Sequence, residues 1–97
     1  MADEVEFDAE KSERNFRERG IDFAFAAQVF HGPHLEIEDR RYNYGEPRLR
    51  VYALFANVLY VVVYASRDGQ RRIISARRGN RRERRLYDRL TAAQGPD

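Results

Sequence analysis

The chain has 97 residues, of which 42% are hydrophobic and 35% are charged, a mixture apolar enough to form a core and too apolar for a disordered chain. It contains no cysteine, which excludes disulfide frameworks, cysteine-ligated zinc sites and thiol nucleophiles. The acidic N-terminus lacks the apolar run of a signal peptide, and the longest apolar stretch, residues 58–65, is too short to span a bilayer. We therefore expect one cytoplasmic domain over residues 1–97, with no membrane partner.

The first segment predicts a short strand followed by a surface helix. Apolar and acidic residues alternate over residues 5–8, which favours an edge strand or an extended segment. Asp8 is a suitable N-cap, and residues 9–19 contain no Pro or Gly before Gly20, so a helix is expected to end at a left-handed glycine. Its apolar content is chiefly Phe16, which predicts that this helix lies on the surface.

A second helix is predicted after Asp22, which is again a suitable N-cap. Apolar residues at helical spacing form one stripe that we expect in the core: Phe23, Ala26, Ala27 and Phe30. The His-Gly-Pro segment at residues 31–33 should end the helix, because a residue before proline is pushed out of the helical region.

The middle of the chain changes to the period of two that is typical of strands. Strands are predicted at about residues 35–38, 48–55, 58–66 and 70–76, with a tight turn at 56–57 and a hairpin at Asp68-Gly69. Asn80 can cap a last helix over residues 81–93. Two N-terminal helices, a run of strands and one C-terminal helix predict an α+β fold around an antiparallel meander sheet.

The net charge of +2 hides an uneven distribution along the chain. Residues 1–39 carry a net charge of −7, residues 40–66 carry +3 and residues 67–97 carry +6. Arg supplies seventeen of the eighteen basic residues, which suits bidentate contact with phosphate. An Arg-preferring genome would explain the bias equally well, but it would not explain the clustering.

The last third gathers its cations around the end of the last strand and the start of the last helix: Arg71, Arg72, Arg77, Arg78, Arg81, Arg82, Arg84, Arg85 and Arg89. Arginines at a strand end, beside the free N–H groups of a helix N-terminus, can converge on a phosphate. A solvated helix face is the alternative for Arg84, Arg85 and Arg89.

Glu46 precedes the second strand and is flanked by arginines at 40, 41, 48 and 50. A carboxylate beside a ribose 2′-hydroxyl could act as a general base, although neighbouring cations weaken a carboxylate in that role. The alternative is a loop acid that neutralises an arginine cluster.

The first helix has a polar side formed at helical spacing by Asp8, Lys11, Asn15 and Arg19. Lys11 is the only lysine of the chain, and it offers a compact, titratable ammonium group that arginine does not. The alternative is the solvated side that any surface helix has.

Two other patterns are set aside. His31 and His34 lie near each other but lack a third ligand at metal-binding spacing, and Ser75 has no nucleophile-elbow context. The chain also has no phosphate-cradling glycine loop, so neither a metal nor a nucleotide cofactor is implied.

Taken together, these segments resemble BrnT toxins of type II toxin–antitoxin modules, small RelE-like endoribonucleases that BrnA-type antitoxins neutralise. The resemblance covers about residues 5–87. The matching positions are Phe7, Asp8, Lys11, Asn15, Gly20, Ile21, Phe23, Ala26, Asp39, Arg41, 44–46, Arg48, 61–64, 72–77, Glu83 and Tyr87. Two positions depart from the family: Arg19 stands where a histidine is frequent, and Phe7 where tryptophan is common.

The resemblance implies a RelE-like fold and metal-independent RNA cleavage, in which a base takes the 2′-hydroxyl proton and cations stabilise the phosphate. For the reaction we assign Glu46 as base or orienting group, Arg41, Arg48 and Arg77 as phosphate clamp, and Lys11 as a further cation or proton donor. For RNA binding we assign Arg19, Tyr44, Arg72, Arg78, Arg81 and Arg82; Tyr44 could stack on a base or simply pack in its loop. The implied partners are RNA and a BrnA-type antitoxin, the latter in a hetero-oligomer, without a cofactor.

Two other classes of function remain open on the residues alone. The arginines of the last third would equally serve a non-catalytic RNA- or ribosome-binding module. The oppositely charged ends of the chain would serve a protein-interaction domain. Turnover of RNA separates the enzyme from both.

Overall fold

The computed structural model describes residues 5–40 and 45–94 and has a mixed α+β fold, which confirms the predicted class. In chain order its elements are β1 (Val5–Glu6), α1 (Ala9–Arg19), α2 (Phe23–Ala27), the 3₁₀ helix η1 (Gln28–His31), β2 (His34–Glu38), β3 (Arg48–Phe55), β4 (Val58–Arg67), β5 (Gln70–Arg78) and α3 (Arg81–Gln94). The predicted caps are also present: Asp8 accepts a hydrogen bond from the Lys11 N–H, and Gly20 is left-handed with φ 74°. None of the described helices is both long and apolar enough to cross a membrane.

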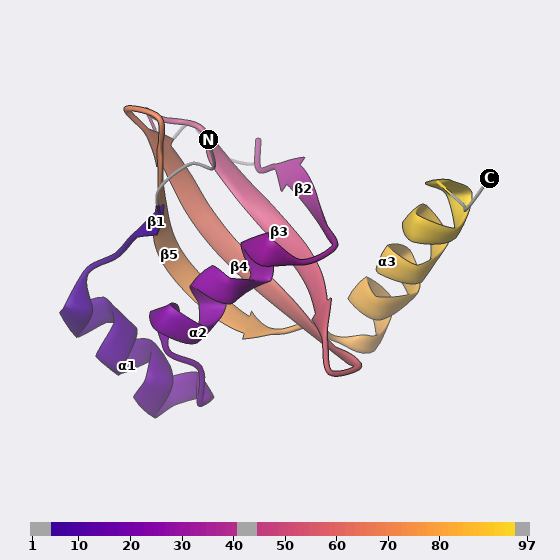
Figure 1. Cartoon of the computed structure of the whole chain (residues 1–97), viewed down its shortest axis with the longest axis horizontal. Helices are drawn as coiled ribbons and strands as arrows, with labels where there is room; N and C mark the ends of the chain where they lie inside the picture. Colours follow the sequence, from indigo (N-terminus) through magenta and orange to yellow (C-terminus); the bar gives the residue numbers. More distant parts are fainter. Residues whose placement is uncertain (1–4, 41–44, 95–97) are drawn as a thin grey trace.

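The five strands form one sheet in the order β1-β5-β4-β3-β2 (Figure 1). Strands β2 to β5 make the predicted antiparallel meander. The sheet is nevertheless mixed, because β1 adds to β5 in parallel and pairs only with Arg71 and Arg72. Beyond these two residues, within the described part of the chain, no strand pairs with the outer edge of β5, and α1 lies there instead.

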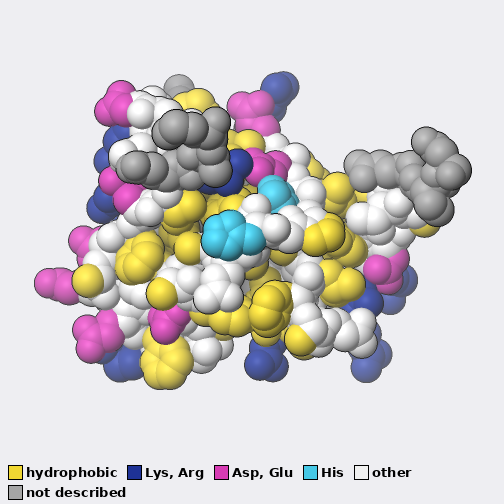
Figure 2. All heavy atoms as spheres, in the orientation of Figure 1, with side chains coloured by type: hydrophobic (Ala, Val, Ile, Leu, Met, Phe, Trp, Pro, Cys, Tyr) yellow, Lys and Arg dark blue, Asp and Glu magenta, His cyan; other side chains and the backbone are white. Residues whose placement is uncertain are grey.

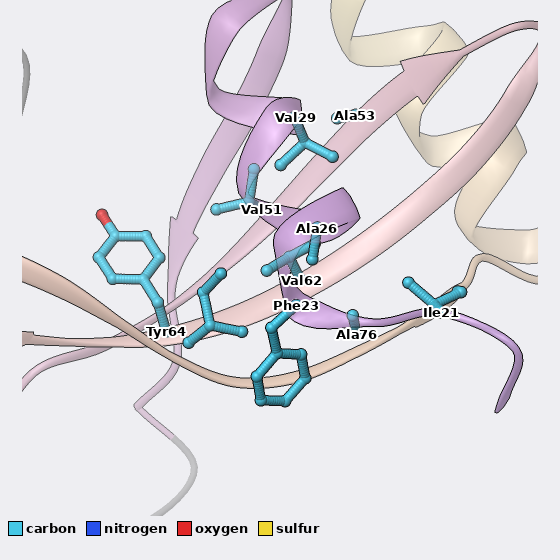
Figure 3. Close-up of a cluster of buried hydrophobic side chains, with 10 residues drawn as sticks. Ile21, Phe23, Ala26, Val29, Val51, Ala53, Val62, Tyr64 and Ala76 are labelled. Atoms are coloured by element: carbon cyan, nitrogen blue, oxygen red, sulfur yellow. The ribbon is translucent and has the colours of Figure 1, made fainter. Parts of the chain in front are cut away.

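Helices α2 and η1 cover one face of the sheet, which we call the helix side, and they build the core there. Phe23, Ala26 and Val29 are buried there against apolar side chains from three strands, among them Val51, Val62 and Ala76 (Figure 3). The predicted stripe is right for its first two members. Ala27 and Phe30 are only partly buried, because the chain tightens into η1 at Gln28 and the narrower turn brings Val29 to the core.

Helix α1 docks through polar side chains, a mode that the sequence did not predict. Phe16 is 54% exposed, whereas Ser12 and Asn15 are buried. Ser12 Oγ accepts a hydrogen bond from the Phe23 N–H at 2.8 Å, and Asn15 Nδ2 donates to the carbonyls of Ile21 and Ala76 at 2.7 and 2.9 Å. Only part of the expected polar side of α1 therefore faces solvent. Asn15 is buried, because it supplies the hydrogen-bonding partners that the edge of β5 needs.

Helix α3 packs on the opposite face of the sheet through its first half and projects to one side (Figure 1). Its Tyr87 packs with Tyr52, Leu59 and Val61. The chain reaches the helix through Gly79, where a Cβ would lie 2.5 Å from Leu59 Cδ2, so only glycine fits without a shift.

Candidate active site

Arginines from β3 and β5 lie on the face of the sheet that carries α3. Tyr52 and Val61, which pack with Tyr87 of α3, identify this face. Arg48 and Arg50 share it with Tyr52, because side chains alternate along a strand. With two arginines of β5 they form what we call the basic face: Arg48, Arg50, Arg72 and Arg77.

The arginines of β5 reach the basic face through an irregularity in the strand. Arg72 pairs with Ala65 and Arg77 with Val61. Arg72 and Arg77 are five positions apart, so a regular strand would place them on opposite faces. The register shifts between Val63 and Tyr64, so that Ile74 is one extra residue in β5. This β-bulge brings Arg72 and Arg77 to the same face.

Arg77 is held by a carboxylate at the start of α3. Its Nη1 and Nη2 donate to Glu83 Oε1 and Oε2 at 2.8 and 2.7 Å. Glu83 also accepts from the Asn80 N–H, and the Glu83 N–H donates to Asn80 Oδ1, which makes a capping box. The hydrogen bonds from Arg77, helped by that N–H and by the charges of Arg77 and Arg50, lower the pKa of Glu83 in spite of its burial. The orientation of the Arg77 guanidinium is therefore fixed.

Glu46 forms hydrogen bonds with an arginine that is not among its neighbours in the sequence. Arg67, at the end of β4, donates from Nε to Oε1 at 3.1 Å and from Nη2 to Oε2 at 3.2 Å. Arg40 pairs with Glu38 instead, at 3.0 Å. The carbonyl of Pro47 accepts from the Ser66 N–H, which places Glu46 at the margin of the basic face, beside the start of β3 and the end of β4.

Arg50 has contacts on the basic face that its position near Glu46 in the sequence does not predict. Its guanidinium lies 5.9 Å from the centre of the Tyr52 ring. Its Nε is buried, without a hydrogen-bond partner in the part of the chain that the structure describes. Its charge also reaches Glu83, whose pKa it helps to lower.

The structure separates the other predicted site residues. Lys11 and Arg19 lie on α1 and line a pocket against β5, away from α3. Arg78 pairs with Tyr60 and alternates to the helix side of the sheet, whereas Arg81 and Arg82 are exposed in the first turn of α3. Arg41 and Tyr44 fall in residues 41–44, outside the described part of the chain.

A second cluster of charged and polar side chains lies on the helix side of the sheet, and little in the sequence predicts it. We call it the Glu36 cluster: His34, Glu36, Tyr64 and Arg71. Tyr64 Oη donates to Glu36 Oε1 at 2.5 Å, and Arg71 Nη2 donates to Oε2 at 3.3 Å. Burial, followed by the hydrogen bond to Glu36, raises the pKa of Tyr64 to about 12. Figure 2 shows this face of the molecule, with the histidines in cyan.

His34 and Arg71 complete this cluster. The ring nitrogens of His34 lie 2.7 Å from the Gly32 carbonyl oxygen and 3.0 Å from Glu36 Oε2. The Arg71 guanidinium lies 4.4 Å from the centre of the Phe30 ring. The alternation of residues 35–38 could have placed His34 and Glu36 on one face, but no local pattern indicates their partner Arg71.

The comparisons with known proteins place the chain in a family. No curated protein matches it. The model of the family described as "Ribonuclease toxin, BrnT, of type II toxin-antitoxin system" matches residues 7–83, well over half of the chain, and this range includes the whole basic face and Glu83. The chain therefore belongs to the BrnT family of ribonuclease toxins of type II toxin–antitoxin systems.

Proposed function

We propose that this chain is an RNA-cleaving toxin whose basic face holds the scissile phosphate and which needs no metal ion. The observation that carries the proposal is the gathering of Arg48, Arg50, Arg72 and Arg77 on one face of the sheet, next to the start of α3. A phosphate attacked by a neighbouring hydroxyl gains negative charge, and fixed guanidinium groups stabilise that charge. A RelE-like arrangement of sheet and helices is part of the proposal.

In this mechanism the ribose 2′-oxygen attacks the adjacent phosphorus and the bond from phosphorus to the 5′-oxygen breaks. Water supplies a proton to the departing 5′-oxygen, and the products are a 2′,3′-cyclic phosphate and a 5′-hydroxyl. Glu46 takes the 2′-hydroxyl proton, with its carboxylate oriented by Arg67. Arg48 and Arg77 bind the phosphate, and the Glu83 contacts keep Arg77 in place. Arg41 would complete this clamp.

Further residues are proposed to bind RNA beyond the scissile phosphate. Arg72 belongs to the basic face, Arg81 and Arg82 lie at the exposed start of α3, and Arg78 extends the charge to the other side of the sheet. Tyr44 would stack on an unpaired base. Arg19 and Lys11 lie on α1, so we propose Lys11 as a cation for binding before any role as proton donor.

Membership of the family implies an antitoxin partner and RNA as the substrate. We propose a BrnA-type antitoxin that forms a hetero-oligomer with this chain in the cytoplasm. An antitoxin that covered the basic face would block cleavage by occupying the phosphate-binding arginines.

The test is RNA cleavage by the purified chain in the presence of EDTA. We expect cleavage to persist and to leave 2′,3′-cyclic phosphate ends, because the proposed chemistry uses only protein side chains. Arg48→Gln should reduce the single-turnover rate by about 10²–10³-fold, the usual loss for one stabilising donor at a reacting centre. Arg17→Gln, an equal charge change on α1, is the control.

Two results would contradict the proposal. If EDTA abolished cleavage and magnesium restored it, the metal-free mechanism would be wrong. If RNA bound with salt-dependent affinity but was not cleaved, the non-catalytic binding module would be the better description, since the same arginines serve it without any acid or base.

A further inference from the structure

A polar pocket lies between α1 and the outer edge of β5. Its volume is about 270 Å³, and its lining includes Lys11, Arg14, Arg19, Asn15 and Ser75. We call it the α1–β5 pocket. It is separate from the basic face, whose arginines project from β3 and β5 toward the α3 side.

The charge of this pocket is unbalanced. Three cations line it, and Glu18 is the one acid among its lining residues. Within residues 5–40 and 45–94, Lys11, Arg14 and Arg19 form no ion pair, in contrast to Arg67, Arg72 and Arg77, which each pair with a carboxylate. A pocket lined by such cations favours an anion as its ligand.

The floor of the pocket is rigid. Asn15 is 7% exposed, and its amide donates to the carbonyl of Ala76 and accepts from the Ala76 N–H, as a neighbouring strand would. This pairing fixes α1 against β5, so the cations of the helix keep their distance from Ser75. Ile74, the extra residue of the β5 bulge, also lines the pocket.

The pocket continues the basic face across the edge of the sheet. Ser75 pairs with Val63, and Val63 pairs with Arg50 on β3. Neighbouring strands lie about 4.8 Å apart, so Ser75 is two strand spacings, roughly 10 Å, from Arg50. A strand of RNA that crosses the sheet from β3 to β5 therefore meets Arg72 and Arg77 first and then reaches this pocket.

We propose that the α1–β5 pocket binds a phosphate of the RNA substrate other than the scissile one, with Lys11, Arg14 and Arg19 as its ligands. This proposal rests on RNA being the substrate of the basic face. It makes the substrate a single-stranded RNA long enough to bridge the two sites, since a duplex cannot follow a path over the edge of a sheet as a flexible strand can. The proposal thereby adds to the RNA-binding site two residues of the pocket lining that the sequence did not predict there, Arg14 and Ser75.

The experiment measures binding of RNAs that carry 2′-O-methyl groups and so cannot be cleaved. A dinucleotide and oligonucleotides of increasing length are titrated against the wild type, Lys11→Gln with Arg14→Gln, and Arg19→Gln. Arg17→Gln is the matched control, because it removes one charge from the same helix outside the pocket. Thermal melting verifies that each variant is folded, which is expected because these side chains are exposed.

The wild type should gain affinity when the RNA becomes long enough to reach the pocket. The double variant should lose that gain, so its dissociation constant for long RNA should be about tenfold higher than that of the wild type. Its plot of log affinity against log salt concentration should be shallower by about 0.7, because one phosphate contact is lost. Arg17→Gln should retain both the gain and the slope.

The proposal is overturned if the folded double variant keeps the affinity gain and the salt slope of the wild type. It is also overturned if the wild type binds no RNA of any length. If the wild type binds RNA with the expected length dependence but does not cleave the unmodified oligonucleotide, the cleavage function fails while the phosphate subsite stands.

Discussion

The two faces of the sheet use arginine in different ways. In the Glu36 cluster a single carboxylate accepts hydrogen bonds from Tyr64 and Arg71 and contacts His34. On the basic face Arg72 and Arg77 pair with Glu6 and Glu83, and Arg48 and Arg50 project from the neighbouring part of the sheet. The Glu36 cluster thus holds one arginine beside one carboxylate, whereas the basic face gathers four arginines. Only the basic face is proposed as a phosphate site.

The largest effect that would sharpen this contrast concerns Glu46. If its carboxylate takes the 2′-hydroxyl proton, Glu46→Gln keeps its shape and removes its basicity, so single-turnover cleavage should slow by about 10²–10⁴-fold. Affinity for RNA should hold or rise, because a negative charge near phosphates is removed. Glu38→Gln, which breaks only an exposed pair with Arg40, should cleave at the wild-type rate. A Glu46→Gln rate within about threefold of wild type would remove Glu46 from the mechanism.

A second, smaller effect tests the assignment of the Glu36 cluster to stability. Tyr64→Phe deletes a hydrogen bond to a carboxylate and should lower the free energy of unfolding by about 1.5–3 kcal/mol, with the rate of RNA cleavage by folded protein unchanged. Tyr60→Phe, on the same strand and face, should cost less, since in the described part of the chain its hydroxyl has no such partner. Chemical denaturation measures both. Loss of cleavage in folded Tyr64→Phe would show that the cluster serves the reaction.

The pH dependence of that contribution follows from the raised pKa. The phenol titrates at about 10 in the unfolded chain and at about 12 in the folded one, so the folded state retains its proton longer. The stabilisation is therefore complete below pH 10 and declines as the pH rises toward 12. In Tyr64→Phe this alkaline decline should be reduced.

The smallest effect concerns Glu83, whose pKa lies below its ordinary value chiefly because Arg77 donates to it. Its contribution is present above the unfolded pKa of 4.5 and is lost as the pH falls through the lowered folded value. Glu83→Gln should cost about 1 kcal/mol at pH 7, a modest figure because Arg77 is partly exposed, and the difference should shrink in acid. Unfolding at pH 7 and pH 3 measures it, with Asp88→Asn as control. A cost independent of pH would assign the effect to the helix cap instead.

The sequence predicted the elements well because their signals are local. Asp8 and Gly20 bound α1, Asn80 caps α3, and Asp68-Gly69 joins β4 to β5 as expected. Each of these residues acts on backbone groups only a few positions away, so its effect does not depend on the rest of the fold.

The contacts of the candidate site could not be predicted in the same way, because they depend on tertiary structure. Glu46 pairs with a residue 21 positions away, and Glu36 with one 35 positions away. Strict alternation would also have put Arg72 and Arg77 on opposite faces, and only the bulge at Ile74 corrects this. Predicting that four arginines share one face therefore requires knowledge of the strand register.

The side chain of Asn15 has a consequence for how this protein behaves among other copies of itself. An unprotected sheet edge offers its N–H and C=O groups to strands of other molecules, which leads to aggregation. At Ala76 one amide occupies both backbone groups, and α1 covers the edge beyond the two residues paired with β1. A polar helix thus protects the edge of β5 from intermolecular strand addition.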